Sequence, residues 1–205
     1  MKTDASAENH TSLQTYWVRH TAVMPAMQKI CYGHSDVELK ETFEQEAEIV
    51  KNNIAGIQAD EIFSSPLSRA KRLASYCGFT DTDIDARLIE LNFGEWEMKT
   101  WTELQGNEED WDPDFFLPYL TRKTPGGESV MDQYLRVLDF IKEKMPVEGK
   151  RSIMMFCHGG VINAARVAAG LAELRHSFSH LPPYGSITKI TFTPQMLQKA
   201  EEVKQ

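Results

Sequence analysis

The 205-residue sequence contains no apolar run that approaches the roughly 20 residues needed for a membrane-spanning helix. Its first residues, Met1 to Gln14, are polar and have no apolar centre, so we expect neither a secretion signal nor a membrane anchor there. We interpret residues 1–14 as a flexible arm and residues 15–205 as a single domain. These features predict a cytoplasmic protein that does not bind a membrane.

Cysteine is scarce as well. The three cysteines, Cys31, Cys77 and Cys157, are too few and too scattered for a disulfide framework, and they lack the paired spacing of a zinc site. Reduced thiols in a cytosolic protein are the simple interpretation. We expect neither a metal nor another cofactor.

Dense positive charge is also missing, since the formal net charge is −8 and no segment is strongly basic. This argues against nucleic acid and anionic membranes as partners. If the substrate is an anion, the positive charge that captures it must be local. The 41% hydrophobic and 25% charged residues are typical of a globular domain with a substantial core. A homodimer is compatible with this composition.

Apolar patterning predicts alternating strands and helices. Residues 15–18, 61–63 and 153–156 form short apolar strands, and the last of these reads as a strand covered on both faces. Three- and four-residue spacing predicts helices over 43–57 and from 128 to about 145. Alternation over residues 187–192 predicts an edge strand. The fold class expected is α/β, a three-layer α/β/α sandwich with a mostly parallel sheet and an edge strand near the C-terminus.

A further helix is expected to begin at Ser65-Pro66, with the serine as its cap and the proline at its first position. It should run to about Tyr76, where Gly78 is placed to end it.

Two histidines follow predicted strands directly. Arg19-His20 comes after the first strand, and His158-Gly159-Gly160 comes after the strand at 153–156. In parallel sheets ligands bind beyond the carboxyl ends of the strands, so these two histidines are expected to lie on the same rim.

Hydrolysis of a phosphate ester without a metal needs a nucleophile, cations for the phosphate oxygens and an acid for the leaving group. A neutral imidazole, the planar guanidinium of arginine and a carboxylic acid supply these three parts. Taken singly, each candidate here also has a structural interpretation. An Arg-His pair ends many strands, a histidine before Gly-Gly can cap a helix, and Glu90 can be a solvated carboxylate.

In sequence order, however, these residues closely resemble the histidine phosphatase superfamily, which has the phosphoglycerate mutase-like fold. Five blocks carry the resemblance: 18–21 (Val-Arg-His-Thr), 64–70 (Ser-Ser-Pro-Leu-Ser-Arg-Ala), 88–97 (Leu-Ile-Glu-Leu-Asn-Phe-Gly-Glu-Trp-Glu), 125–129 (Pro-Gly-Gly-Glu-Ser) and 157–162 (Cys-His-Gly-Gly-Val-Ile). They run in family order through most of the chain.

The resemblance implies a metal-independent phosphatase whose substrate is a small phosphate ester. His20 is then the nucleophile that forms a phosphohistidine, Glu90 the proton donor to the leaving group, and His158 a second histidine on the phosphoryl oxygens. The implied substrate-binding residues are Arg19 and Arg69, as the phosphate clamp, with Thr21, Gly33 and Gly159. For Gly159 the support is helix physics, because a helix N-terminus offers free N–H groups to an anion.

Three positions depart from the family pattern. Thr21 stands where the family usually has glycine, Val23 where it has threonine, and Ala26 where it has asparagine. These positions normally help to line the phosphate pocket. They leave open a catalytically weak, phosphate-binding regulatory protein.

Residues 31–37 (Cys-Tyr-Gly-His-Ser-Asp-Val) resemble the α-ribazole-5′-phosphate phosphatases of cobalamin nucleotide-loop assembly. A small cap-like insertion is expected around residues 96–125. It is rich in aromatic rings that either stack on a flat base or simply pack together. A phosphoglycerate mutase-type phosphotransferase is the alternative activity. A metal-dependent hydrolase would rely on His176 and His180, which are four residues apart, although Pro182-Pro183 argues against a helix there.

Overall fold

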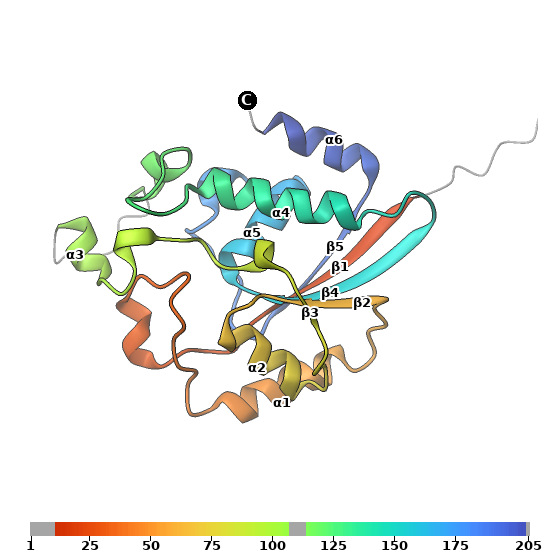
Figure 1. Cartoon of the computed structure of the whole chain (residues 1–205), viewed down its shortest axis with the longest axis horizontal. Helices are drawn as coiled ribbons and strands as arrows, with labels where there is room; N and C mark the ends of the chain where they lie inside the picture. The colour runs from red at the N-terminus through yellow and green to blue at the C-terminus, as the bar shows by residue number, and fades with distance from the viewer. Residues whose placement is uncertain (1–10, 107–113, 204–205) are drawn as a thin grey trace, which may run out of the picture.

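The computed structural model describes residues 11–106 and 114–203. A five-stranded sheet with the order β3-β2-β4-β1-β5 forms its centre (Figure 1). The strands are β1 (Ser12–Arg19), β2 (Glu61–Ser64), β3 (Asp83–Ile84), β4 (Lys150–Cys157) and β5 (Ile187–Phe192). All neighbouring strands are parallel except β1 and β5, which are antiparallel. The prediction of a mostly parallel sheet with a C-terminal edge strand is confirmed.

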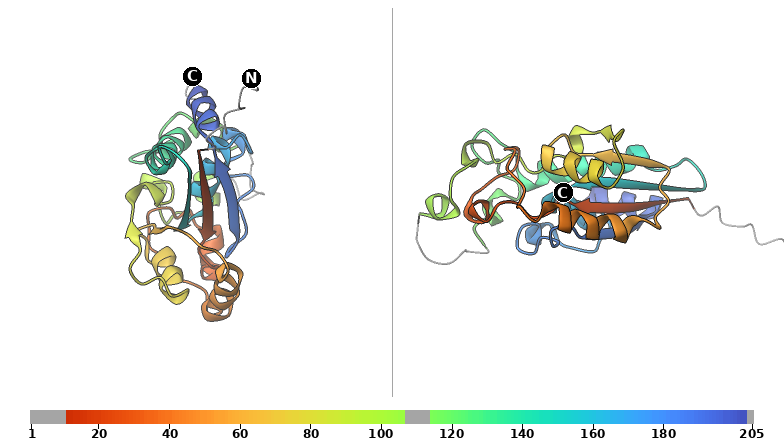
Figure 2. Two further views of the ribbon diagram at one scale, coloured as in Figure 1. Left: turned by 90° about the vertical axis from the view of Figure 1, so that its right-hand side faces the viewer. Right: turned by 90° about the horizontal axis from the view of Figure 1, so that it is seen from below.

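Helices cover both faces of this sheet (Figures 1 and 2). One face carries α1 (Phe43–Ile54) and α2 (Ser68–Tyr76), and the other carries α4 (Val130–Lys144), α5 (Gly159–Ala168) and α6 (Pro194–Glu202). The short α3 (Trp101–Gln105) lies apart from the sheet. In the described part of the chain, every helix is too short or too polar to cross a membrane.

Side chains of β4 alternate between these two layers. Ile153, Met155 and Cys157 belong to the core beneath α4, α5 and α6, whereas Met154 and Phe156 pack against α1 and α2. All five are at most 1% exposed. The strand is therefore covered on both faces, as its continuous apolar run predicts.

The first strand begins earlier than the sequence indicates. Ser12, Leu13 and Gln14, assigned above to the flexible arm, are part of β1, while residues 1–10 of that arm lie outside the described residues. The correction follows from tertiary pairing, since β1 is hydrogen-bonded to β4 on one side and to β5 on the other. Leu13 is also fully buried, although its polar neighbours give no apolar run.

The start of α2 is also different. The helix begins at Ser68, and Ser65 is not its cap. The backbone N–H of Ser68 donates to the Asp36 carboxylate (2.9 Å), which comes from a loop far away in the sequence. Because this cap is supplied by a tertiary contact, the local Ser-Pro signal marks a turn instead.

Two elements, β3 and α6, are not among those predicted above. β3 is only two residues long. By contrast, α6 carries a local signal, because Thr193 caps it and Pro194 occupies its first position. Of the expected insertion at 96–125, the structure describes 96–106 and 114–125. The rings of Trp96, Trp101, Phe116 and Tyr119 pack there against one another. Trp111 and the acids Glu108, Glu109 and Asp110 lie outside the described residues.

Candidate active site

The carboxyl ends of β1 and β4 bring the two sequence-distant histidines together. Arg19 is the last residue of β1 and pairs with Cys157 of β4, and the N–H of His20 donates to the Cys157 carbonyl (3.1 Å). His158 follows β4 directly and precedes α5. The imidazole centroids of His20 and His158 are 5.2 Å apart, so the predicted rim is confirmed.

Backbone contacts orient the imidazole of His20. Its Nδ1 lies 2.8 Å from the carbonyl oxygen of Thr21, which can only accept, so Nδ1 carries the proton and Nε2 keeps a free lone pair. Burial, followed by the positive charges of Arg69 and Arg19, holds the pKa of His20 well below 6.5. At neutral pH this imidazole is therefore uncharged and nucleophilic.

His158 is buried beside it. Its Nε2 lies 2.7 Å from the hydroxyl of Ser65, the residue directly after β2, which does not cap α2. Burial and the neighbouring Arg69 and His20 hold the pKa of His158 well below 6.5. Both histidines are thus kept neutral in the folded protein.

Arg19 is held by the loop before β5. Its Nη1 donates to the carbonyl of Pro182, and its guanidinium carbon lies 3.9 Å from the ring centroid of Tyr184. Tyr184 also lies next to His20, with 5.4 Å between ring centroids. The loop therefore fixes the cation with a carbonyl and a ring face rather than with a carboxylate.

Arg69, on α2, is fully buried and is held by the loop at residues 33–36. Its Nη1 donates to the carbonyl of Ser35 (2.8 Å) and its Nη2 to the carbonyl of Gly33 (2.7 Å). The half-exposed Asp36 carboxylate lies 3.9 Å away. Burial lowers the pKa of Arg69, and nearby acids, Glu90 first, oppose that effect.

Glu90, in the segment that follows β3, lies close to the arginines and histidines just described. Its carboxyl accepts from the Gln133 side chain (2.8 Å), the Gly160 N–H (3.1 Å) and the Leu91 N–H (3.0 Å). The first-turn N–H of Gly160 at the start of α5 thus binds a protein carboxyl. A Cβ at Gly160 would overlap Glu90, so only glycine allows this approach.

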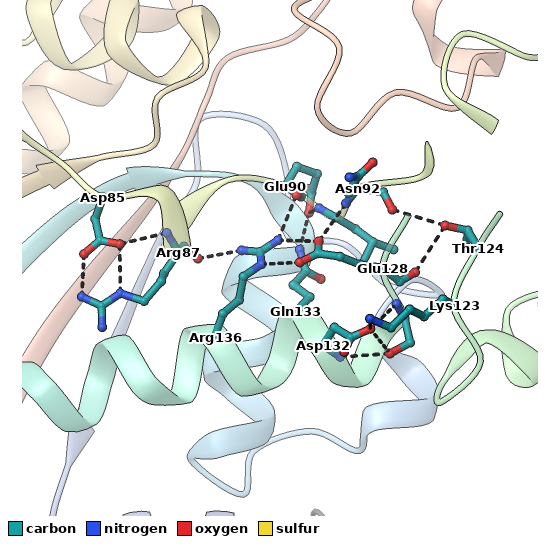
Figure 3. A network of polar contacts seen from close by, with 12 residues as sticks. Asp85, Arg87, Glu90, Asn92, Lys123, Thr124, Glu128, Asp132, Gln133 and Arg136 are labelled. Atoms are coloured by element: carbon teal, nitrogen blue, oxygen red, sulfur yellow. Dashed lines mark hydrogen bonds and ion pairs between the residues drawn. The ribbon is translucent and has the colours of Figure 1, made fainter. Parts of the chain in front are cut away.

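A polar network from α4 holds the segment that carries Glu90 (Figure 3). Arg136 donates to the carbonyls of Arg87 (2.6 Å) and Glu90 (2.9 Å) and binds the Glu128 carboxylate (2.9 Å). Glu128 also accepts from the N–H of Asn92 (2.9 Å). Glu128 of the Pro-Gly-Gly-Glu-Ser block therefore supports the segment that carries Glu90, and residues 125–129 are not part of the cavity lining described below.

Arg19, His20, Arg69 and Glu90 line a cavity of about 270 Å³. Its polar lining comprises the two arginines, His20, Glu90, Gln28 and two tyrosines, whose hydroxyls are 2.8 Å apart. Its apolar lining consists of Ile30, Phe93, Trp101, Phe178 and Leu181. Within the apolar lining, Phe93 contacts both Trp101 and Phe178, so these three rings form one cluster, whereas Leu181 and Arg19 both lie next to Gly159.

Arg19, His20, Arg69 and Glu90 line the cavity, and His158, which is not part of the lining, lies directly beside His20. The other three predicted residues do not line the cavity but contact residues that do: Thr21 binds His20, Gly33 binds Arg69, and Gly159 packs on Arg19. Their direct binding of substrate stays a prediction.

The departures from the family pattern have different consequences. Thr21 keeps the carbonyl that orients His20, so replacing glycine does not remove that contact. Val23 is buried and pairs with Leu39 as an isolated bridge. Ala26 is exposed on a short 3₁₀ helix (Pro25–Lys29).

Four buried polar atoms at the site have no hydrogen-bond partner among the described residues. They are the Nε atoms of Arg19 and Arg69, Nδ1 of His158 and the hydroxyl of Thr21. Buried polar groups are nearly always paired, so unpaired ones point to a missing partner. Nitrogens of this kind suit a ligand with several negatively charged oxygens.

In the described part of the chain, no three His, Cys, Asp or Glu side chains are grouped closely enough to hold a metal ion. His176 ends a 3₁₀ helix (Leu174–His176), and His180 lies beyond it. The two histidines therefore do not share a helix face.

Sequence reasoning did not assign three residues that shape the site. Ser65 was interpreted as a helix cap but binds His158, Tyr184 covers Arg19, and Gln133 holds Glu90. Each acts through a contact between distant segments. The one local signal was the polar Gln133 on the otherwise apolar face of α4, where it is 1% exposed.

Comparison with known proteins agrees with this geometry. The family model of the histidine phosphatase superfamily (branch 1) matches residues 15–201. The probable phosphoglycerate mutase GpmB of Salmonella paratyphi C is 33% identical over 129 residues, which are 61% of this chain and 60% of that protein. The chain thus aligns with less than two thirds of the length of such curated relatives.

Solved structures share the fold. A mycobacterial glucosyl-3-phosphoglycerate phosphatase superposes with a TM-score of 0.73 at 23% identity, covering 88% of this chain and 90% of that one. A candidate α-ribazole-5′-P phosphatase from Escherichia coli K-12 gives 0.72 at 20% identity, covering 89% and 92%. At these identities the likeness concerns the fold alone.

The two neutral histidines predict a pH dependence of stability. Because their folded-state pKa values lie well below 6.5, protons bind preferentially to the unfolded chain as the pH falls below 6.5. The free energy of unfolding should therefore fall there, by up to about 1.4 kcal/mol per pH unit for each histidine. Urea unfolding between pH 7.5 and 5.5 measures this, and a His20→Gln/His158→Gln variant should show a shallower slope. Equal slopes would contradict neutral burial of the pair.

Proposed function

The chain belongs to the histidine phosphatase superfamily, and from that premise we propose that it is a metal-independent phosphomonoester hydrolase that forms a phosphohistidine on His20. One observation carries the proposal. Among the described residues, buried nitrogens of Arg19, Arg69 and His158 have no hydrogen-bond partner, and these three residues lie near His20, a neutral imidazole whose Nε2 keeps its lone pair. A phosphate monoester supplies both the oxygens for those donors and the phosphorus for that nucleophile.

In the first step, the lone pair on Nε2 of His20 attacks phosphorus and the bond to the leaving oxygen breaks. Arg19 and Arg69 hold the non-bridging oxygens, whose charge spreads in the transition state, and His158 donates from Nδ1. Glu90 gives its proton to the leaving alkoxide. The products are an alcohol, a phosphohistidine and the Glu90 carboxylate.

In the second step, water enters the position of the departed alcohol. The Glu90 carboxylate takes its proton while the oxygen attacks phosphorus, and the bond to Nε2 breaks. Gln133 and the N–H of Gly160 keep the carboxyl in one orientation for both steps. Inorganic phosphate leaves and His20 is neutral again.

The lining of the cavity favours a hydrolase over a phosphoglycerate mutase. A sugar acid brings a carboxylate besides its phosphate, and that charge needs its own cation. Arg19 and Arg69 are the cations among the described residues of the lining, and both are assigned to the phosphate. The name of the relative GpmB keeps mutase-type transfer as the second candidate.

The leaving group we propose carries a flat or apolar portion, as in α-ribazole 5′-phosphate. Supporting this, Phe93, Trp101 and Phe178 line the cavity and contact one another as a cluster of rings. A fold neighbour is named as a candidate α-ribazole-5′-P phosphatase. We propose that residues 96–125, which supply Trp101, act as a cap over this part of the cavity.

The thiols support a cytoplasmic location. Cys31 and Cys157 are buried, Cys77 is half-buried, and all three are free. Free thiols suit a reducing compartment. A homodimer and the absence of nucleic-acid binding stay predictions.

The nucleophile is tested with a chromogenic aryl phosphate in the presence of a chelator. His20→Ala should lower kcat by at least about a thousandfold, because no covalent intermediate can form. Rapid acid quenching should trap acid-labile, base-stable phosphate on the wild-type chain and none on the variant. An active His20→Ala variant would refute the assignment. Tight phosphate binding by a wild-type chain without turnover would favour the regulatory alternative.

Glu90 is tested by varying the leaving group. An alkoxide needs a proton and a nitrophenolate hardly does, so Glu90→Gln should cost about 10²- to 10⁴-fold on alkyl phosphates and much less on p-nitrophenyl phosphate. Steady-state kinetics on both substrates measure the difference. Similar losses on the two would argue against the role of proton donor.

A substrate panel tests the leaving-group proposal. We expect kcat/KM to be higher for α-ribazole 5′-phosphate than for sugar phosphates or 3-phosphoglycerate. Trp101→Ala should reduce that preference, whereas Trp17→Phe, in the buried core and outside the cavity lining, should not. A preference for 3-phosphoglycerate would support the mutase alternative.

A further inference from the structure

The carboxylate of Glu97 binds a turn of backbone N–H groups beside the site. Its two oxygens accept from Gly33 (3.0 Å), His34 (3.0 Å) and Ser35 (3.1 Å), which are consecutive in the chain. A fourth N–H, from Phe93, lies 3.2 Å from Oε1. Glu97 does not line the cavity, so this concentration of donors serves something other than direct contact with substrate.

The same three-residue turn holds Arg69 from its opposite side. The carbonyls of Gly33 and Ser35 accept from the two terminal nitrogens of the guanidinium. One peptide unit, between Gly33 and His34, is therefore bonded at both ends, with its N–H on Glu97 and its C=O on Arg69. A carboxylate at the N–H end polarises the unit and strengthens its carbonyl as an acceptor.

The local backbone geometry allows Glu97 to come close to the turn at residues 33–35. A Cβ at Gly33 would overlap the Leu91 carbonyl and lie 2.9 Å from Glu97, so only glycine fits. Directly after Glu97, Met98 adopts a left-handed backbone with φ 65°, which is disfavoured for a side chain of this kind. That conformation lets the Met98 N–H donate to the Cys31 carbonyl (2.7 Å), which fastens the two segments together.

Glu97 is ionised in this environment. Burial alone would raise the pKa of its carboxyl, but hydrogen bonds from Ser35 and from the N–H groups of Gly33 and His34 overcome burial and hold the pKa below its usual range. A full negative charge thus lies one peptide unit away from the buried cation.

We propose that Glu97 is a positioning residue for the phosphate clamp: through the turn at residues 33–35 it holds the Arg69 guanidinium in place. The inference rests on the proposed function, in which Arg69 binds phosphate. Holding the guanidinium through backbone carbonyls has a chemical advantage, because a carboxylate at hydrogen-bond distance would compete with the substrate, and Asp36 stays at 3.9 Å. Among the described residues, Arg69 Nε has no hydrogen-bond partner.

The pKa of His20 reports the position of Arg69, and it can be measured without any enzymatic turnover. The groups around the His20 imidazole are Arg19, Arg69, His158, Tyr184 and Glu90, and after burial Arg69 is the largest influence lowering its pKa. If the guanidinium loosens and moves away, the pKa of His20 must rise. A change in the packing of the loop alone would leave it unchanged.

The test compares Glu97→Gln with Glu95→Gln. Each variant removes one negative charge, and the two positions are only two residues apart in the chain. Glu95, however, is exposed on the surface. In Glu97→Gln we expect inorganic phosphate to bind about ten- to a hundredfold more weakly and kcat/KM to fall similarly, because the clamp is misplaced. NMR titration of phosphate-free protein should show a raised pKa of His20. Glu95→Gln should resemble the wild type in all three measurements.

A double-mutant cycle that combines Glu97→Gln with Arg69→Ala tests whether Glu97 acts on His20 through Arg69. If Glu97 acts through Arg69, Glu97→Gln leaves the pKa of His20 unchanged once Arg69 is absent. A full additional shift in that background would overturn the proposal, as would a lowered melting temperature with an unchanged His20 pKa in the single variant. Should Glu97→Gln not fold, Glu97→Asp carries the same comparison, with the charge kept and the shift smaller.

The proposed phosphatase activity and the positioning role of Glu97 can be refuted independently of each other. A wild-type chain that hydrolyses no phosphomonoester would overturn the proposed function, yet a raised pKa of His20 in Glu97→Gln would still support the positioning role. Wild-type hydrolysis with equal phosphate affinity in Glu97→Gln and Glu95→Gln would overturn the positioning role alone.

Discussion

Arg19 and Arg69 are cations buried at the carboxyl edge of the sheet, and their burial constrains the surroundings. A buried charge is tolerated when it is hydrogen-bonded or paired. Here the hydrogen bonds come from carbonyls of Pro182, Gly33 and Ser35. Carbonyls satisfy donors without cancelling charge, and the half-exposed Asp36 carboxylate stays 3.9 Å away from Arg69, so both cations retain attraction for an anion. The same charges disfavour protonation of the two histidines between them.

Much of the fold is readable from the sequence because its core elements carry strong periodic signals. The apolar run of β4 and the spacing of α1 and α4 depend on burial patterns that repeat along the chain. The errors occur where structure depends on distant partners. Residues 12–14 become strand because β4 and β5 bond to them, and α2 starts at Ser68 because the Asp36 carboxylate receives its first N–H.

The site divides in the same way. His20, Arg69, Glu90 and His158 were predicted since they follow strand ends or stand in blocks that resemble a known family. Tyr184 has no comparable local context, and its relevance comes from lying over Arg19. Glu97 belonged to a recognised block, but its contacts with the turn at 33–35 arise only in the folded chain. Residue types identify chemistry, whereas supporting contacts require the fold.

The pairing of β1 has a consequence for insertions and deletions. Successive residues of a strand point to opposite faces, so Trp17 and Arg19 share the face that packs on α5, while Val18 faces α1 and α2. Gaining or losing one residue before Arg19 would either shift the pairing with Cys157 or turn the guanidinium toward the wrong layer. The number of residues between Leu13 and His20 therefore decides which layer of the fold receives the Arg19 guanidinium.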